Sequence, residues 1–280
     1  MCAHEVTRRR STASPWPGPG APVVVDTPAD LGPEAVLVDV RWSAEGRPAR
    51  DAYLAGHLPG AVLCDVETDL LGTVGGRRAG LPSPEALASV LGRLGIAAGT
   101  AVVAYDDLGG VAAAWLVWML RALGQPAAVL DGGLARYAGD LQTGDVAPAP
   151  VVVEARPWPA DRVADLAAVV SPDVRIVDAR PLDRYHGLDQ PADARSGHIP
   201  GAVSLFWRDT VDADGRLLPP DRLRAVVEGA GGPEPVVCYC GTGAGAAHVL
   251  LALEHAGLGA GRLYAGSWAE YGATDLPVAR

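Results

Sequence analysis

The chain repeats the same short motifs in the same order, which restricts it to folds built from two similar halves. A Val-Asp-x-Arg motif stands at 38–41 and 177–180, and a His-(Leu/Ile)-Pro-Gly-Ala-Val motif at 57–62 and 198–203. A short β-branched run then ends in Asp106 in the first half and in Cys240 in the second. The copies of Asp39, His57 and Asp106 come 139, 141 and 134 residues later. Offsets this constant indicate a duplicated domain.

Each half alternates β-branched runs with stretches of helical periodicity. Ser83-Pro84-Glu85 is a typical helix start, and a second helix is expected over 244–255, shortly after the strand 236–239. Strands that alternate with helices predict an α/β fold, in which each half has a mostly parallel sheet flanked by helices. Ligands of such sheets bind at the carboxyl ends of the strands, which is where Cys240 is expected.

The predicted boundaries are a disordered tail over 1–22, a first domain over 23–145 and a second domain over 160–280. A Pro- and Ala-rich linker separates the two domains. The tail contains Arg8-Arg9-Arg10, but no apolar stretch follows, so it is not a secretory signal; its role is open. The longest apolar run, 111–120, is shorter than the roughly 20 residues of a membrane-spanning helix, so no membrane contact is expected.

Composition excludes several kinds of chemistry. The chain contains 23 Lys+Arg, none of them lysine, so no P-loop or Schiff-base lysine is available. Its net charge of −10 gives no electrostatic reason to expect nucleic acid as a partner. The four cysteines lack the spacing of a zinc site, and no nucleotide-binding fingerprint is present, so no metal or cofactor is expected. The cytoplasm is the expected compartment, with the thiols reduced.

The candidate reactive group is Cys240. The segment Gly241-Thr242-Gly243-Ala244-Gly245 lies between it and a helix, and glycines at alternate positions allow backbone N–H groups to converge on one point. Those amides and the helix dipole favour an anion there, either the thiolate or a persulfide formed on it. Cysteine phosphatases use a similar loop but need an arginine six residues after the cysteine; Ala246 occupies that position.

Together, the tandem layout, the two His-(Leu/Ile)-Pro-Gly-Ala elements and the Cys-Gly-Thr-Gly loop resemble the two-domain rhodanese-type sulfurtransferases. The resemblance covers the chain from about Val23 to its end. It implies a catalytically silent first domain, consistent with Asp106 at the cysteine position, and a reactive second domain that carries a persulfide on Cys240. Gly241 and Thr242 match the branch that prefers 3-mercaptopyruvate, so this donor is favoured and thiosulfate comes next.

The resemblance also implies donor-binding arginines. Arg184 matches the arginine that binds the donor's anionic group, and Arg195 is a candidate for the second. The histidines of the repeated motif, His57 and His198, are interpreted as structural because the silent half keeps its copy. In the mercaptopyruvate branch the first-half histidine and a nearby aspartate support the loop hydroxyl in proton transfer. Whether His57 or Asp51 does so here is open.

The expected function is transfer of sulfur from a small anionic donor to cyanide or a thiol, for example the thiol of a thioredoxin-like reductant. Two alternatives stay open. The chain could be a sulfur-relay or binding module that serves a partner protein, or a cysteine phosphatase, against which Ala246 argues.

Overall fold

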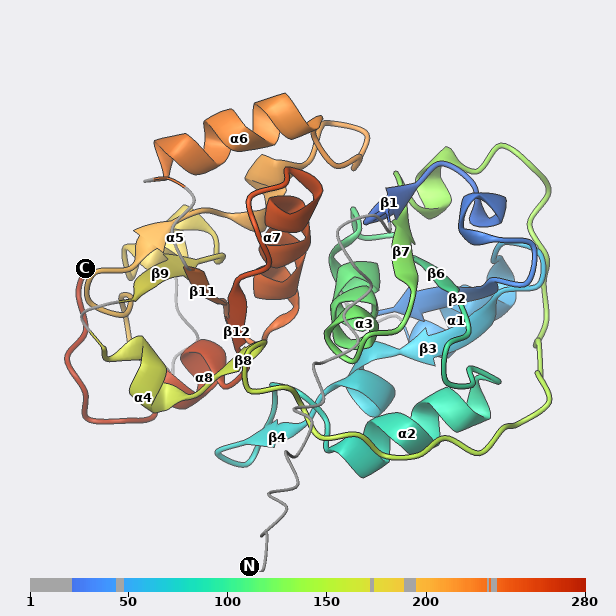
Figure 1. Cartoon of the computed structure of the whole chain (residues 1–280), viewed down its shortest axis with the longest axis horizontal. Helices are drawn as coiled ribbons and strands as arrows, with labels where there is room; N and C mark the ends of the chain where they lie inside the picture. The colour runs from blue at the N-terminus through green and yellow to red at the C-terminus, as the bar shows by residue number, and fades with distance from the viewer. Residues whose placement is uncertain (1–21, 44–47, 172–173, 189–194, 231, 233–235) are drawn as a thin grey trace, which may run out of the picture.

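The computed structural model describes residues 22–43, 48–171, 174–188, 195–230, 232 and 236–280. The expected disordered tail lies outside the described residues, except for Pro22. Two separate five-stranded sheets, each with all strands parallel, occupy the two halves of the chain (Figure 1). Helices flank both sheets. The predicted α/β fold of two such halves is therefore confirmed.

The first sheet has the strand order β1-β7-β6-β2-β3. Its strands are β1 (Val24–Val25), β2 (Val36–Arg41), β3 (Val62–Asp65), β6 (Val102–Tyr105) and β7 (Ala127–Leu130). The helices of this half are α1 (Ala49–Ala55), α2 (Pro84–Arg93) and α3 (Val111–Ala122), with single turns at Pro28–Leu31, Val66–Leu70 and Leu134–Arg136. A small antiparallel hairpin is formed by β4 (Thr73–Val74) and β5 (Arg77–Arg78).

The second sheet has the order β10-β9-β11-β12-β8, the same arrangement of equivalent strands. Its strands are β8 (Val163–Ala164), β9 (Arg175–Asp178), β10 (Val203–Ser204), β11 (Val236–Tyr239) and β12 (Arg262–Tyr264). Its helices are α4 (Leu166–Val169), α5 (Leu182–Tyr185), α6 (Pro220–Gly229), α7 (Ala244–His255) and α8 (Ser267–Tyr271), with a turn at Trp207–Thr210.

Local sequence signals place two helices where they were predicted. The Ser83 hydroxyl accepts the N–H of Ala86 at 3.2 Å and caps α2, with Pro84 at its first position. Helix α7 spans the predicted range, and its first turn follows the glycine-rich segment directly.

The two halves share one hydrophobic core. Helices α3 and α7 pack against each other in the middle of the molecule, between the two sheets (Figure 1). Every residue of α3 is buried, because the first sheet covers one side and α7 the other. The buried Arg121 of α3 pairs with Glu254 of α7, and Arg216 Nε lies 2.7 Å from a carboxylate oxygen of Asp131. Both ion pairs connect the two halves.

The connection between the halves lies along the first half without regular secondary structure. The N–H of Val151 donates to the Gly92 carbonyl at 2.9 Å, and the Trp158 indole N–H donates to the Pro82 carbonyl at 3.0 Å. The predicted linker is therefore bound to the first half, and we call this connecting segment the strap.

Candidate functional site

Cys240 lies at the carboxyl end of β11, four residues before α7 begins, and its side chain is 6% exposed. The N–H of Gly243 donates to Cys240 Sγ at 3.0 Å, so the loop turns back onto its own sulfur. Gly243 has φ +121°, and a Cβ there would lie 2.6 Å from the Trp115 ring. Only glycine fits this position, for reasons of backbone conformation and of space.

The segment after β12 binds the loop through hydrogen bonds to the backbone of Cys240 and Gly241. Ser267 Oγ accepts the N–H of Cys240 at 3.3 Å, and the Trp268 N–H donates to the Cys240 carbonyl at 2.9 Å. The Ala269 N–H donates to the Gly241 carbonyl at 3.3 Å. No local motif in the sequence predicts these contacts.

The first half contacts the loop after Cys240 directly. The N–H of Gly80, just after the β4–β5 hairpin, donates to the Thr242 carbonyl at 2.9 Å. The ring of Trp115 of α3 also lies against Gly243. The candidate site therefore lies at the junction of the two halves, and no local motif in the sequence signals the contribution of Gly80.

In the first half, the equivalent loop before α3 binds the carboxylate of Asp106. The Asp106 carboxylate accepts four backbone N–H groups at 2.8–2.9 Å, from Leu108, Gly110, Ala112 and Ala113. Burial raises the pKa of Asp106, and the four amide donors oppose that shift. A loop of this geometry can thus hold a buried negative group, as the sequence predicts for Cys240.

The other predicted residues lie as follows. Arg184 lies on α5, and its backbone N–H donates to the Asp183 carboxylate at 2.7 Å. Arg195 donates through Nη1 to the carbonyls of Thr274 and Leu276, at 2.5 and 2.8 Å, so this group holds the C-terminal segment. Ala246 is fully buried in the first turn of α7.

Both motif histidines make the same local contacts. His57 stacks on Tyr53 with ring centroids 4.0 Å apart, and its Nδ1 lies 3.0 Å from the Tyr53 carbonyl oxygen. His198 does the same with Tyr185, at 3.7 and 2.9 Å. These matching contacts agree with the structural interpretation of both residues. Asp51 lies on the exposed side of α1.

A buried Asp–Arg–Tyr network, which sequence reasoning missed, occurs once in each half. In the second half, Arg180 Nη2 binds Asp178 at 2.6 Å, and the Tyr239 hydroxyl donates to the same carboxylate at 2.5 Å. Arg180 also lies over the Trp268 ring, 4.3 Å from its centroid. The first half repeats the network with Asp39, Arg41 and Tyr105. The repeated Val-Asp-x-Arg motif was the available signal.

His248 is a buried histidine of α7 at the junction of the halves. The Thr210 hydroxyl donates to the Trp207 carbonyl at 2.6 Å, so His248 Nδ1, 3.2 Å from Thr210 Oγ1, must be the donor in that contact. His248 Nε2 is then unprotonated, and it faces Gly110 of the first half. Burial lowers the pKa of His248 to about 4.

This lowered pKa predicts acid sensitivity of the folded state. Between pH 6.5 and about 4 the unfolded chain binds a proton that His248 in the folded chain does not, so stability falls as the pH falls through this window. The expected loss from this group is about 3 kcal/mol. Urea unfolding at pH 6.5 and 4 measures it, and the His248→Gln variant should lose less by about that amount. An equal loss in both proteins would contradict the assignment.

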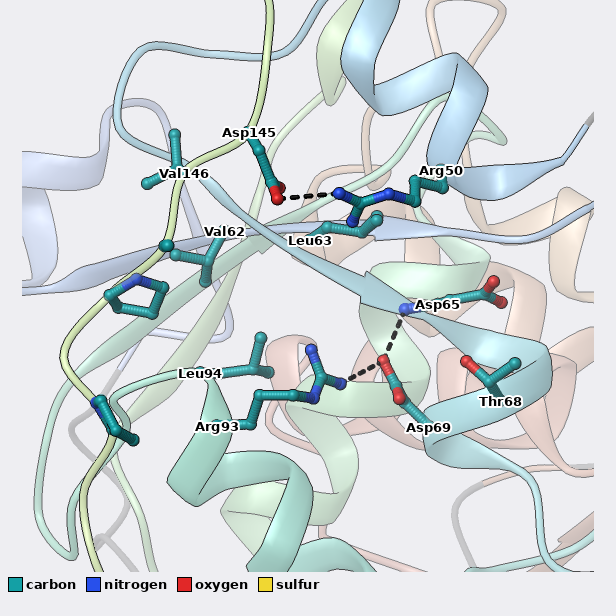
Figure 2. A pocket seen from close by; sticks show the side chains of 13 residues that line it. Arg50, Val62, Leu63, Asp65, Thr68, Asp69, Arg93, Leu94, Asp145 and Val146 are labelled. Atoms are coloured by element: carbon teal, nitrogen blue, oxygen red, sulfur yellow. Dashed lines mark hydrogen bonds and ion pairs between the residues drawn. The ribbon is translucent and has the colours of Figure 1, made fainter.

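A cavity of about 590 Å³ lies away from this site, between β3, α2 and the strap (Figure 2). Its two arginines are paired, Arg50 with Asp145 at 2.8 Å and Arg93 with Asp69 at 2.7 Å. All of its lining residues belong to the first half and the strap, so it does not include Cys240. Within the described part of the chain, no cluster of three or more His, Cys, Asp or Glu could hold a metal ion. None of the described helices has the length and apolar character needed to cross a membrane.

The family model of the rhodanese-like domain matches the chain twice, at residues 26–140 and 162–274. The chain belongs to the rhodanese family. A probable 3-mercaptopyruvate sulfurtransferase of Pseudomonas aeruginosa is 37% identical over 257 residues, which cover 85% of this chain and 89% of the relative. A putative thiosulfate sulfurtransferase, SseB of Mycobacterium tuberculosis, is 36% identical over 264 residues, which cover 89% of this chain and 92% of the relative.

Solved structures of rhodanese proteins share the fold over most of the chain. The 3-mercaptopyruvate sulfurtransferase from Leishmania major has a TM-score of 0.76 at 29% identity, covering 89% of this chain and 74% of that protein. SseA from Escherichia coli has a TM-score of 0.73 at 32% identity, covering 85% and 94%. At 85% and 89% coverage, the similarity extends over both halves of this rhodanese.

Proposed function

We propose that this rhodanese is a sulfurtransferase that moves one sulfur atom from a small anionic donor to a thiophilic acceptor through a persulfide on Cys240. The observation that carries the proposal is the position of Cys240 in a glycine cradle, with its sulfur accepting the Gly243 N–H at 3.0 Å. Relatives whose names describe sulfur transfer, from 3-mercaptopyruvate or thiosulfate, support it.

The proposed reaction has two displacement steps. Cys240 thiolate attacks the donor sulfur; in 3-mercaptopyruvate the carbon–sulfur bond breaks, and the departing enolate takes up a proton to become pyruvate. The transferred sulfur is then the outer atom of the persulfide. Cyanide or a thiolate attacks that atom, the sulfur–sulfur bond breaks, and Cys240 leaves as the thiolate. In each step one bond to the transferred sulfur forms as another breaks, so neither step needs an oxidant or a reductant.

We assign roles to the loop by its geometry. The backbone of Gly241, Thr242, Gly243, Ala244 and Gly245 is the proposed binding loop, in which the Gly243 N–H that donates to Sγ would stabilise negative charge on the sulfur. Arg184 is the proposed ligand of the donor's anionic group. Arg195 is the second candidate, and it would contact the donor with guanidinium nitrogens other than Nη1, which is bound to the C-terminal segment.

We propose 3-mercaptopyruvate as the preferred donor and thiosulfate as the next. Gly241 and Thr242 bring no cation to the sulfur, whereas a dianion such as thiosulfate gains most from local cations. The second substrate is proposed to be cyanide or a thiol, such as the thiol of a thioredoxin-like protein. Because the chemistry requires a free thiol, we place it in the cytoplasm; Cys240 is unpaired in the structure.

The test is intact-mass spectrometry combined with thiocyanate formation from cyanide, with each donor supplied separately. The expected results are a mass gain of one sulfur atom located on the Cys240 peptide, catalytic turnover, and a higher kcat/KM with 3-mercaptopyruvate. A mass gain without turnover would show a relay module instead. No mass gain with either donor would contradict the proposal.

A further inference from the structure

The N–H group that donates to the sulfur of Cys240 belongs to the peptide group between Thr242 and Gly243. The Gly243 N–H donates to Cys240 Sγ at 3.0 Å, and the Thr242 carbonyl accepts the N–H of Gly80 at 2.9 Å. The carbonyl and the N–H of a planar trans peptide point in opposite directions. One peptide group of the second half therefore lies between a donor of the first half and the sulfur.

Gly243 itself does not fix the orientation of this peptide group. Its φ is +121°, and glycine adopts positive and negative φ with similar ease. A rotation of the peptide plane would exchange the two ends of the group, so that the Thr242 carbonyl oxygen faced the sulfur. An N–H favours negative charge on the sulfur, whereas a carbonyl oxygen disfavours it. The orientation of the plane therefore decides how readily Cys240 becomes a thiolate.

The neighbouring carbonyls show how this orientation is maintained. The carbonyls of Cys240 and Gly241 accept N–H groups from the second half, at 2.9 and 3.3 Å. The next carbonyl along the chain, that of Thr242, accepts its N–H from the first half, through Gly80. The last of three consecutive carbonyls is thus held across the junction, and it belongs to the peptide group that reaches the sulfur.

Trp115 restricts the same peptide group by direct contact. A Cβ added to Gly243 would lie 2.6 Å from the Trp115 ring, and the three nearest atoms there all belong to this ring. Trp115 is fully buried, and its indole N–H donates to the Leu70 carbonyl at 3.0 Å. Because that bond fixes the ring, Gly243 has little room to rotate.

Gly80 is fixed by the same segment of the first half. It follows the β4–β5 hairpin and is buried at the junction of the halves (Figure 1). The Gly72 N–H donates to the Gly80 carbonyl at 3.0 Å, and Gly72 lies two residues after Leu70, which binds Trp115. A buried N–H is costly to leave unpaired, so the bond from Gly80 resists rotation of the 242–243 peptide group.

The equivalent loop of the first half needs no such support. The Asp106 carboxylate accepts four N–H groups of its own half. Among the described residues, Cys240 Sγ has one hydrogen-bond donor, the Gly243 N–H. The carboxylate organises its own loop through four bonds, whereas the sulfur depends on a single peptide group whose orientation is held from the other half.

We propose that Gly80 and Trp115 are positioning residues, which hold the 242–243 peptide group with its N–H on Cys240 Sγ, so that the first half sets how readily Cys240 forms its thiolate. The inference rests on the proposed function for the statement that this thiolate transfers sulfur. The two hydrogen bonds of the peptide group reinforce each other, because each one polarises the group in the same direction.

The test is the pH profile of alkylation by iodoacetamide, located on Cys240 by fragmentation of its peptide in the mass spectrometer. In this reaction a carbon–sulfur bond forms and iodide leaves. Since the thiolate is the form that reacts, the midpoint of the profile reports how readily it forms. A change of access to the sulfur would scale the rate at every pH and leave the midpoint where it is.

The first pair of variants is Gly80→Ala and Gly76→Ala. Both glycines have positive φ, +70° and +80°, so alanine brings similar backbone strain. A Cβ on Gly80 would lie 3.1 Å from Val74 Cγ2 and 3.2 Å from the Ala265 carbonyl oxygen, whereas one on Gly76 would meet no atom within 4 Å. The midpoint should rise by at least about half a pH unit in Gly80→Ala and by less than about 0.2 in Gly76→Ala.

The second pair is Trp115→Phe and Trp118→Phe. Both tryptophans are fully buried in α3, and the indole nitrogen of Trp118 has no hydrogen-bond partner among the described residues. The smaller ring at position 115 frees Gly243, so the midpoint should again rise by about half a pH unit or more, and it should stay in place in Trp118→Phe. Urea unfolding checks that all four variants are folded under the conditions of alkylation.

Equal midpoints within both pairs would overturn the proposal. A difference within only one pair would overturn the role of the positioning residue in the other pair. Alkylation requires no sulfur transfer, so the two proposals fail separately. Midpoints that move as expected in a protein that forms no persulfide would contradict the proposed function alone, and normal sulfur transfer with unmoved midpoints would contradict the positioning roles alone.

Discussion

The Cys240→Ser variant is expected to lose thiocyanate formation by at least about a thousandfold and to show no gain of sulfur by mass. A serine hydroxyl can accept the Gly243 N–H in the same loop, so the fold should persist, but it cannot carry a sulfane sulfur. Intact-mass spectrometry after exposure to 3-mercaptopyruvate, together with circular dichroism, separates loss of chemistry from loss of structure.

The matched control is Cys238→Ala. Cys238 is fully buried two residues earlier in β11, and burial raises the pKa of its thiol well above the ordinary value, so it does not supply a thiolate. Its replacement should keep turnover within about threefold and cost only the stability of a small core truncation. A persulfide that persists in Cys240→Ser and disappears in Cys238→Ala would move the reactive role to Cys238.

Replacing Asp106 with alanine is expected to destabilise the whole chain by about 4 kcal/mol or more, even though this residue lies in the half that does not contain Cys240. Four N–H groups lose their acceptor at once, two of them buried and two partly buried, and each buried orphaned donor costs about 1–3 kcal/mol before the loop relaxes. Chemical denaturation followed by tryptophan fluorescence measures the change, since Trp115 is buried in the helix that these amides begin.

Asp106→Asn provides the comparison. Its amide oxygen can still accept the N–H pair on one side, but its NH₂ group faces N–H donors on the other, so we expect about half of the loss seen for alanine. If Asp106→Ala were as stable as wild type, the carboxylate would not be what organises this cradle. Because α3 also carries Trp115, which packs on Gly243, the alanine variant should lower sulfur transfer as well.

The sequence was sufficient to predict the parts of this molecule that depend on local signals. The repeat of Val-Asp-x-Arg and of the His-Pro-Gly motif predicted two similar α/β halves, and the glycines after Cys240 predicted where α7 begins. The pattern around Ser83 predicted the start of α2 for the same reason: the cap is formed by neighbours in the chain.

The contacts that complete the site could not be predicted in this way. Gly80 reaches Thr242 across 162 positions of sequence, and periodicity reports which residues are buried but not which buried faces meet. Arg180 was missed for a different reason. A motif present in both halves is typical of a structural role, so the buried Asp–Arg–Tyr network that it forms in each half was not singled out.

The complete burial of α3 between the first sheet and α7 has a consequence for how this protein can be divided. Apart from Arg121, every residue of α3 is apolar, so either half expressed alone would expose a continuous apolar surface and should associate or precipitate. The sequence repeat divides the molecule into two domains, but the packing of α3 against α7 joins them into one cooperative unit. Unfolding should therefore proceed as a single transition.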